Sequence, residues 1–426
     1  MRADENRARL GGLAAGDLLL RSGDDASHQA PVTDTLMSEL PLGPFARLTE
    51  LLDGIKPGKD PINLSIGDPS GTVPPFVADA LTKAAASFGN YPAITGTDEW
   101  RDAAAGWLNR RFELNGAIRP TEHVLPLNGT REGLFSVLFP LLPRIKAGGK
   151  PIVGMPNPFY QAYAAAALGA STEPLYVAAT EATGFLPDYA SLPEATLERL
   201  AAVYICSPSN PEGAAANEEY WRKLFALADR YDFIVLADEC YTDIYFDRPP
   251  LCALSARFQQ TGDFRRLLTF HSLSKRSGLP GLRSGMVAGD AGLIARFRGF
   301  RTVAGPQVPG PIQAASAAAW RDEPHVAANR AAYAGKMAAA ERILGNRVTR
   351  PAGGFFLWLP TGNGEETTLG LWRDEGVKVL PGAYMGREIE PGKTQSNPGF
   401  SYIRIALVSD LSTIITALER VKNFLG

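Results

Sequence analysis

The chain has 426 residues, of which 45% are hydrophobic and 21% charged, and its formal net charge is -2. This length predicts two domains, or a large domain with a smaller one attached. Near-neutral charge and the lack of an apolar run long enough to span a membrane argue against a nucleic-acid or membrane partner. We therefore expect a soluble globular protein.

The cysteines and histidines favour neither disulfides nor a metal site. Cys206, Cys240 and Cys252 lack the spacing of metal ligands, and the first two lie in apolar runs, where reduced thiols are common. The four histidines are scattered and form no set of ligands. We expect a cytoplasmic protein with free thiols and no bound metal.

Residues 1–36 are expected to be a disordered extension. They mix Arg, Asp, Gly and Ala with one short apolar run, and they lack the basic start and apolar core of a secretory signal. The following segment, to about residue 80, contains a strand that turns sharply at Gly67. Helices are predicted at 45–52, from 75 to about 88, and at 99–111.

From His123 onward, short apolar runs alternate with longer helical stretches. Runs that are apolar on both faces and alternate with helices predict an α/β fold, with a mostly parallel, seven-stranded sheet flanked by helices. Ligands of such sheets bind at the carboxyl ends of the strands. The strands are expected at 124–127, 151–155, 173–177, 202–206, 233–237, 267–270 and 286–288, with helices at 131–142, 161–168 and 218–231 among those between them.

The pattern changes after about residue 306 to that of a smaller α+β unit. A long Ala-rich helical stretch runs through Trp320 to about Leu344. Strands are expected at 355–359, 377–380 and 402–407, and a last helix from 411 to about 425. The predicted domains are an N-terminal segment at 37–80 that packs with the small domain, a large domain at 81–310 and a small domain at 311–426.

The stretch 271–285, His-Ser-Leu-Ser-Lys-Arg-Ser-Gly-Leu-Pro-Gly-Leu-Arg-Ser-Gly, places Lys275 in a loop at the end of the sixth strand. A lysine in a partly desolvated pocket loses its proton and attacks a carbonyl carbon, forming a Schiff base. Ser272, Ser274 and Arg283 supply hydroxyl donors and a guanidinium that match a phosphate. A phosphorylated aldehyde fits this combination, although by itself the stretch fits a solvated basic loop equally well.

Two further motifs follow the first two strands. Asn128-Gly129-Thr130-Arg131 opens a helix whose free N–H groups favour phosphate, and Gly129 permits a close approach. Tyr160 stands where its ring can stack on a planar cofactor. Taken singly, the first motif is also an ordinary turn and helix cap, and Tyr160 a packing residue.

The fourth and fifth strands lead into Asn210 and Asp238. An Asn-Pro bond in a tight turn, which can be cis, holds the Asn210 amide where it can donate to a ring oxygen of the cofactor; a plain turn is the alternative. Asp238 ends a buried strand, so its carboxylate needs a cationic partner such as a protonated pyridine nitrogen. That pairing makes the ring an electron sink. Tyr241 is expected to reach the same ring oxygen as Asn210.

In this order, Asn210-Pro211-x-Gly213, Asp238-x-x-Tyr241, Ser272-x-Ser274-Lys275 and Arg283-x-Gly285 resemble the fold-type-I pyridoxal-phosphate aminotransferases of classes I and II. The resemblance extends from about Leu36 to the C-terminus. It implies pyridoxal 5'-phosphate as cofactor, amino-acid and 2-oxo-acid substrates, and a homodimer with shared active sites.

The resemblance also implies a role for each matching residue. Lys275 would bind the cofactor covalently and shuttle the proton, Asp238 would pair with the pyridinium, and Asn210 and Tyr241 would hold the ring oxygen. Arg404 would bind the substrate α-carboxylate as a bidentate pair, with a backbone contact from Gly67; a surface charge is the alternative for Arg404. The remaining cofactor-binding residues would be Gly129, Thr130, Arg131, Tyr160, Ser272, Ser274, Arg283 and, from the second subunit, Tyr91.

The amino-acid sequence of these motifs is similar to that of proteobacterial succinyldiaminopimelate aminotransferases, which act in lysine and diaminopimelate biosynthesis. The chain departs from that pattern at Glu212, where Thr is usual, and at Gly278, where Asn is common. A succinylated substrate carries carboxylates far from the reacting carbon and requires a distal cation. The resemblance suggests Arg301 for this role, from the neighbouring subunit, with Arg131 as a second possibility.

Three other functions remain open at this point. One is another class I or II aminotransferase acting on aspartate, alanine or an aromatic amino acid, and another is a β-eliminating lyase on the same scaffold. The third, from a different class, is a ligand-sensing aminotransferase-like domain of a transcription regulator. Such regulators carry an N-terminal winged helix, for which residues 1–36 are too short.

Overall fold

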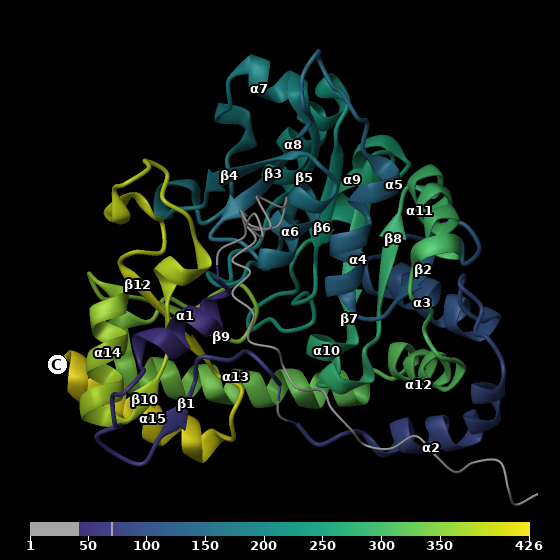
Figure 1. Ribbon diagram of the computed structural model, residues 1–426. Helices are drawn as coiled ribbons and strands as arrows, with labels where there is room; N and C mark the ends of the chain where they lie inside the picture. Colours follow the sequence, from purple (N-terminus) through teal and green to yellow (C-terminus); the bar gives the residue numbers. More distant parts are fainter. Residues whose placement is uncertain (1–41, 70) are drawn as a thin grey trace, which may run out of the picture. The chain divides into compact units, whose positions relative to one another are not determined.

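The computed structural model describes residues 42–69 and 71–426 (Figure 1). The predicted extension at 1–36 lies outside the described residues. Among the residues that are described, no helix is both long and apolar enough to cross a membrane.

A seven-stranded sheet in the order β2-β8-β7-β6-β5-β3-β4 forms the centre of the large domain (Figure 1). β8 runs antiparallel to both of its neighbours, and the β7-β6-β5-β3-β4 pairs are parallel. The predicted α/β class and mostly parallel sheet are therefore confirmed. The strands are β2 (Val124–Leu127), β3 (Ile152–Asn157), β4 (Glu173–Ala178), β5 (Leu200–Cys206), β6 (Ile234–Asp238), β7 (Leu267–Ser272) and β8 (Gly285–Gly289).

Helices cover both faces of this sheet because alternate strand residues point to opposite sides. In β5, Val203 and Ile205 join one hydrophobic cluster and Ala202 and Tyr204 the other. The first cluster includes α3 (Asp98–Arg111), α8 (Glu218–Tyr231), α9 (Ala253–Thr261) and α12 (Gly310–Arg321). The second includes α4 (Thr130–Ser136), α5 (Leu138–Leu141), α6 (Gln161–Gly169) and α11 (Ala291–Ala304). The short helix α7 (Glu194–Arg199) leads directly into β5.

The small domain is built on an antiparallel three-stranded sheet in the order β11-β12-β9. Its core joins β9 and β12 to the last turns of α13 and to α14 and α15. A separate parallel pair joins β1 (Ile62–Asn63) to β10 (Val377–Lys378). The other elements are β9 (Phe356–Pro360), β11 (Leu380–Pro381), β12 (Tyr402–Ala406), α13 (Pro324–Leu344), α14 (Gly364–Glu375) and α15 (Leu411–Leu425).

Parts of the predicted N-terminal segment pack with different domains. Leu48 and Leu52, in and just after α1 (Pro44–Leu51), pack against Leu380 and Ala383 of the small domain. By contrast, α2 (Pro75–Lys83), followed by a short 3-10 helix, packs against α12. The assignment of residues 37–80 as one segment that packs with the small domain stays a prediction.

The long Ala-rich stretch is two helices rather than one. α12 ends at Arg321 and α13 begins at Pro324, which is tolerated in a first helical turn because proline lacks an N–H group. α12 packs against α2 and α3 of the large domain. The predicted boundary between the domains at about 310 stays a prediction, and the break at 322–323 is a second place where that boundary can lie.

Candidate active site

A cavity of about 510 Å³ opens at the carboxyl ends of β5, β6 and β7, where Cys206, Asp238 and Ser272 reach its wall. Phe356 and Arg404 of the small domain close it from the other side. Such an edge is where ligands of parallel sheets are expected. Twelve of the predicted site residues line the cavity: Gly67, Thr130, Arg131, Tyr160, Asn210, Asp238, Tyr241, Ser272, Ser274, Lys275, Arg283 and Arg404.

Lys275 lies on the four-residue helix α10 (Leu273–Arg276), so its predicted position in a loop is wrong. Ser272 caps this helix, because its hydroxyl oxygen accepts a hydrogen bond from the Ser274 N–H at 3.1 Å. The Lys275 ammonium donates to the Gly67 carbonyl oxygen at 2.8 Å. Burial lowers its pKa to about 8, which brings a neutral, nucleophilic amine within reach near neutral pH.

Gly67 brings its carbonyl to this lysine because it has no side chain. A Cβ atom at this position would lie 2.6 Å from the Phe356 ring, far inside van der Waals contact. The glycine is therefore required for close packing, rather than for the sharp turn that the sequence predicted there. Its backbone contact to a substrate carboxylate stays a prediction.

Asp238 is buried, with 6% of its surface exposed, at the end of β6. Its Oδ2 accepts from the Tyr163 hydroxyl at 2.7 Å and its Oδ1 from the Cys240 N–H at 3.3 Å. Burial raises the pKa of this carboxyl group, and neither hydrogen-bond donor is a cation. A protonated ring nitrogen would supply the missing positive charge and would lower that pKa.

Tyr163 is a site residue that the sequence did not single out. It lies three residues after Tyr160 in the first turn of α6, and this spacing places both rings on one helix face. The rings meet edge to face at 5.6 Å, and Tyr163 also stacks on Tyr204 at 4.3 Å. The spacing of three residues from Tyr160 was the signal in the sequence that could have found it.

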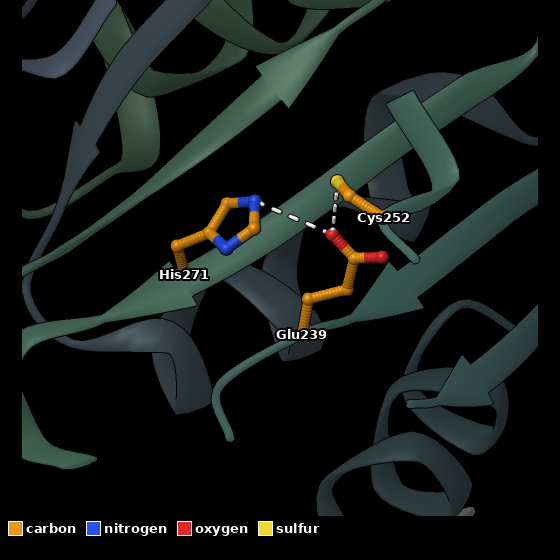
Figure 2. A group of neighbouring side chains, drawn as sticks. All are labelled: Glu239, Cys252 and His271. Atoms are coloured by element: carbon orange, nitrogen blue, oxygen red, sulfur yellow. Dashed lines mark hydrogen bonds and ion pairs between the residues drawn. The ribbon is translucent and has the colours of Figure 1, made fainter. Parts of the chain in front are cut away.

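Glu239 follows Asp238 at the end of β6 but does not line the cavity, and it contacts Cys252 and His271 (Figure 2). Its carboxylate accepts from the Ala253 N–H at 2.7 Å and from the Cys252 thiol at 2.7 Å, and His271 Nε2 lies 3.5 Å from it. Burial raises the pKa of Glu239 to about 7 and lowers that of His271 to about 3, so the imidazole is neutral at pH 7.

The three side chains have ligand atoms within 4.8 Å of one another, although the sequence suggested no histidine-containing ligand set. They are fully buried, and the small cavity beside them has no room for a water molecule. The Glu239 carboxylate already accepts the Cys252 thiol hydrogen. We therefore assign this group the structural role of holding the strand that carries Asp238.

Arg404 and Asn210 meet across the cavity. Arg404 Nη1 donates to Asn210 Oδ1 at 3.1 Å, and Nη2 donates to the Ser65 carbonyl oxygen at 2.7 Å. Burial lowers the pKa of Arg404 to about 10, and its Nε has no hydrogen-bond partner. A buried guanidinium without a carboxylate partner is suited to bind one from a substrate. The Asn210–Pro211 peptide is cis, and burial raises the pKa of the nearby Tyr241 phenol.

Arg283 and Gly129 form the end of the cavity where a phosphate was predicted. Arg283 donates to the carbonyl oxygens of Pro280 at 3.1 Å and Asn128 at 3.2 Å, which fixes its guanidinium. Gly129 has a φ of 82°, and a Cβ atom there would collide with that guanidinium. The hydroxyl groups of Thr130 and Ser272 line the same cavity.

Arg131 and Tyr160 are joined by a hydrogen bond from Arg131 Nε to the Tyr160 hydroxyl. The guanidinium carbon lies 5.7 Å from the centre of the Tyr160 ring. Arg131 is exposed and pairs with no carboxylate among the described residues. It remains available to an anionic ligand.

Arg301 is not available to bind an anionic ligand within its own chain. It is buried, it forms an ion pair with Glu132, and its Nη2 donates to the Pro306 carbonyl oxygen at 2.7 Å. It does not line the cavity. The interpretation of Arg301 as a free distal cation therefore finds no support in the geometry of this chain. Tyr91, in contrast, is 97% exposed, as a residue that reaches into a second subunit would be, and that role stays a prediction.

Neither residue that departs from the family pattern lines the cavity. Gly278 has a φ of 62°, in the left-handed region that glycine and asparagine enter most readily. Glu212 has one buried carboxylate oxygen without a hydrogen-bond partner, and burial raises its pKa to about 8.

The desolvated lysine, the buried aspartate without an ion pair and the arginine fixed beside Gly129 together fit pyridoxal phosphate, which defines a pyridoxal-phosphate enzyme of fold type I. Residues 59–420 match the family described as aminotransferase class I and II, and the chain belongs to this family. When bound to enzymes of this family, the cofactor supplies an electron sink for the substrate α-carbon.

Comparison with known proteins agrees with this assignment. The chain is 33% identical to a probable aminotransferase of Mycobacterium tuberculosis, over 92% of this chain and 88% of that protein. It is 31% identical to an LL-diaminopimelate aminotransferase of Desulforudis audaxviator, over 90% of this chain and 95% of the relative. A crystal structure of an aminotransferase from Neisseria meningitidis superposes with a TM-score of 0.87 at 40% identity, covering 92% of this chain and all of that one.

Proposed function

We propose that the enzyme interconverts N-succinyl-LL-2,6-diaminopimelate plus 2-oxoglutarate and N-succinyl-2-amino-6-oxopimelate plus glutamate, in lysine and diaminopimelate biosynthesis. The observation that carries the proposal is that three guanidinium groups line one cavity, those of Arg131, Arg283 and Arg404. The cofactor phosphate and the substrate α-carboxylate account for Arg283 and Arg404. Arg131 is left for a second carboxylate, which both glutamate and the succinylated substrate carry.

In this proposal each residue acts on the substrate or the cofactor directly. Arg404 binds the α-carboxylate and so orients the α-carbon toward Lys275, whose neutral amine accepts the α-proton and returns it. Asp238 would pair with the ring nitrogen of the cofactor and favour its protonated form, while Asn210 and Tyr241 would hold the ring oxygen. Tyr160 and the apolar wall at Phe356 exclude water, which strengthens the charge interactions inside the cavity.

LL-diaminopimelate itself is a second candidate substrate, and one feature of the cavity favours it. Asp68 lines the cavity and adds a carboxylate that none of the assigned roles uses. The free distal ammonium of LL-diaminopimelate would pair with it, whereas the succinylated amide would not. Relatives from Desulforudis audaxviator and Aquifex aeolicus, each 31% identical, carry the name LL-diaminopimelate aminotransferase.

Single-turnover half-reactions test these alternatives. The enzyme with its cofactor is mixed with each amino donor, and the cofactor absorbance is followed. We expect N-succinyl-LL-diaminopimelate and glutamate to react with the highest kcat/KM. Faster reaction with LL-diaminopimelate, aspartate, alanine or an aromatic amino acid would assign the enzyme to that substrate, release of an eliminated group would indicate a lyase, and no reaction with any donor would favour a sensor domain.

The substitution Arg131→Gln tests the observation behind the proposal. It should lower kcat/KM for glutamate and the succinylated donor by about 30-fold, because a charge-assisted pair is lost, and should affect alanine by less than about threefold. Arg301→Gln is the comparison variant. A larger effect on dicarboxylic donors in Arg301→Gln than in Arg131→Gln would transfer the role to Arg301 of a second subunit.

A further inference from the structure

The helix α13 connects the main chain of Lys275 with the core of the small domain. It begins directly after the break at 322–323 and runs for 21 residues, which corresponds to about 30 Å. Its first turns contact the segment that carries Lys275, whereas Met337, Ala340 and Leu344 near its end belong to the small-domain core. The same helix therefore touches both sides of the cavity.

Residues spaced four apart form the stripe that makes these contacts, because such residues share a helix face. Asn329 Nδ2 donates to the main-chain carbonyl oxygens of Lys275 and Arg276, both at 3.1 Å. One turn later, Tyr333 stacks on Phe355 with ring centres 5.1 Å apart, and the Lys275 ammonium lies 5.3 Å from the centre of that same ring. One turn further, Met337 is buried in the small domain.

His325, at the start of the stripe, fixes the residue that follows α10. Its Nε2 lies 2.8 Å from the Ser277 hydroxyl, and its Nδ1 lies 2.6 Å from Asp322 Oδ1, in the break between the helices. These distances resemble those of a serine hydrolase triad. However, Ser277 is buried and lines none of the larger cavities, so a substrate cannot reach its hydroxyl group. The two contacts of His325 therefore hold Ser277 in place and do not activate it as a nucleophile.

Arg276, next to Lys275, connects the same segment to α12 and to the break itself. Its Nη1 donates to the Ala319 carbonyl oxygen of α12 at 2.7 Å, and its Nη2 donates to Glu323 at 2.8 Å. Arg276 is buried and also lies 3.0 Å from Asp243. The large domain thus holds Arg276, while α13 holds the carbonyl groups of Lys275 and Arg276.

We propose that Asn329 and His325 are positioning residues for Lys275, which transmit the position of the small domain to the lysine through α13. Binding of a substrate carboxylate to Arg404 acts on the small domain, and α13 carries that displacement to the main chain of Lys275. The lysine is therefore placed for proton transfer when the carboxylate site is filled. The inference rests on the role of Lys275 in an aminotransferase and not on which amino acid the enzyme prefers.

Spectroscopic titration of the holoenzyme measures this coupling without turnover. The pKa of the cofactor absorbance is determined with and without saturating glutarate, a dicarboxylate that has no amino group to react. Glutarate should shift that pKa in the wild type, and the shift should fall to less than about one third in Asn329→Ala, because the link between the sites is broken. The affinity for glutarate should stay within about threefold, since Arg404 is unchanged.

The same variant should lose about 10- to 100-fold in kcat, with KM changed less than about threefold, as expected when a reacting group is misplaced by a fraction of an ångström. Asn329→Asp keeps the shape of the side chain but removes the donor, so it should be as impaired as Asn329→Ala. Ala332→Gly weakens the same helix at an exposed position by about 1 kcal/mol without touching the stripe, and should behave like the wild type.

Wild-type coupling in both Asn329 variants would overturn the proposal, as would the absence of any glutarate shift in the wild type. Equal losses in Ala332→Gly and Asn329→Ala would also overturn it, because they would trace the effect to helix stability. If Asn329→Ala does not fold, Ser277→Ala carries the same test, since it breaks the His325 contact and leaves α13 intact. A wild type that binds no cofactor would instead contradict the assignment of the family's chemistry to this chain.

Discussion

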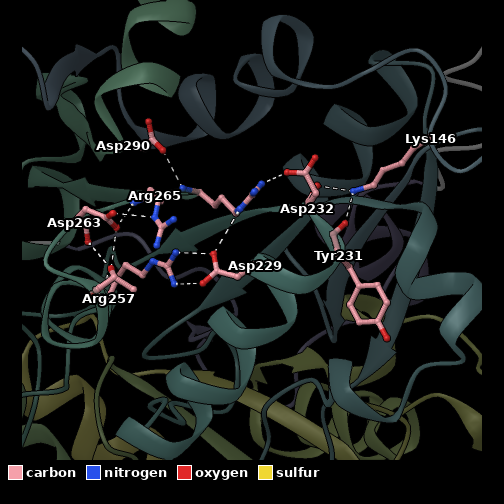
Figure 3. Close-up of polar contacts among 10 residues, drawn as sticks. Lys146, Asp229, Tyr231, Asp232, Arg257, Asp263, Arg265 and Asp290 are labelled. Carbon is pink, nitrogen blue, oxygen red and sulfur yellow. Dashed lines mark hydrogen bonds and ion pairs between the residues drawn. The ribbon is translucent and has the colours of Figure 1, made fainter.

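Two lysines lie at opposite edges of the central sheet, one beyond the carboxyl ends of its strands and one before their amino ends. They show that residues with similarly lowered pKa values can have different roles. Lys275 follows β7 and Lys146 precedes β3, and burial lowers the pKa of each to about 8. The Lys146 ammonium donates to the carbonyl oxygens of Tyr231 at 2.8 Å and Asp232 at 2.5 Å (Figure 3), and also to that of Leu200. Lys275 has one such acceptor and faces a cavity.

The charged residues around Lys146 neutralise one another. Asp229 accepts from both terminal nitrogens of Arg257 at 2.7 and 2.8 Å, and Arg265 pairs with Asp263 at 2.8 Å (Figure 3). At the other edge, among the described residues, Asp238 forms no ion pair with a cation and Arg404 none with a carboxylate. The difference teaches that a lowered pKa alone does not identify a reactive lysine. Unpaired charges facing a cavity do, because a ligand must satisfy them.

The largest effect should come from Lys275→Ala. We expect loss of the cofactor's covalent attachment and at least about a 10⁴-fold loss of turnover, because the nucleophile and the proton carrier are removed together. Lys146→Ala is the matched control and should keep turnover within about twofold. Steady-state kinetics and the absorbance spectrum check both variants, and full activity of Lys275→Ala would refute the mechanism.

Arg404→Ala should come next, with a loss of about 2–5 kcal/mol in transition-state binding, or roughly 30- to 5000-fold in kcat/KM. The loss should be similar for every amino acid tested, since all carry the α-carboxylate. Kinetics with glutamate and alanine provide the measurement. A loss confined to dicarboxylic donors would mean that Arg404 binds the distal carboxylate instead.

Arg257→Ala tests the opposite edge. Arg257 is buried, and its removal leaves Asp229 without its bidentate partner, so the free energy of unfolding should fall by about 3 kcal/mol. The kcat of the folded fraction should stay within about twofold. Urea denaturation measures the free energy of unfolding, and kinetics at low temperature measure kcat. A large fall in kcat without destabilisation would contradict the claim that Arg257 contributes to stability and not to catalysis.

The smallest effect is a dependence on pH. Because only the neutral amine of Lys275 attacks an aldehyde, attachment of pyridoxal phosphate to the cofactor-free protein should slow by about tenfold per pH unit below pH 8. Above pH 8 the rate of attachment should level off, because most of the Lys275 side chain is then already neutral. Stopped-flow absorbance follows the reaction, and a midpoint near the ordinary lysine value of about 10.4 would contradict the burial argument.

The sequence predicted the sheet well because its strands are apolar on both faces. All seven residues of β5 are buried, and a short apolar run of this kind between two helices is typical of a strand in a covered sheet. The cavity residues followed from this, because each motif stands just after a strand. The helix that carries Lys275 was missed since four residues are too few to show a helical period.

Other errors have different causes. The break between α12 and α13 was signalled by Pro324, but alanine-rich sequence on both sides concealed it. Glu239, Cys252 and His271 come from separate elements and lie close together only in the folded chain, so no local sequence pattern reveals their proximity. Arg301 and Arg131 were both possible distal cations in the sequence, and the structure separates them by the burial of Arg301 and its ion pair with Glu132.

The most direct test of the account is to locate the covalent cofactor. The purified protein with pyridoxal phosphate is reduced with borohydride, digested and analysed by peptide mass spectrometry. We predict a single phosphopyridoxyl group on the peptide that contains Lys275, with Lys146 unlabelled despite its similarly lowered pKa. Label on Lys146 or spread over surface lysines would contradict the claim that unpaired charges around the cavity, and not the lysine pKa alone, define the site.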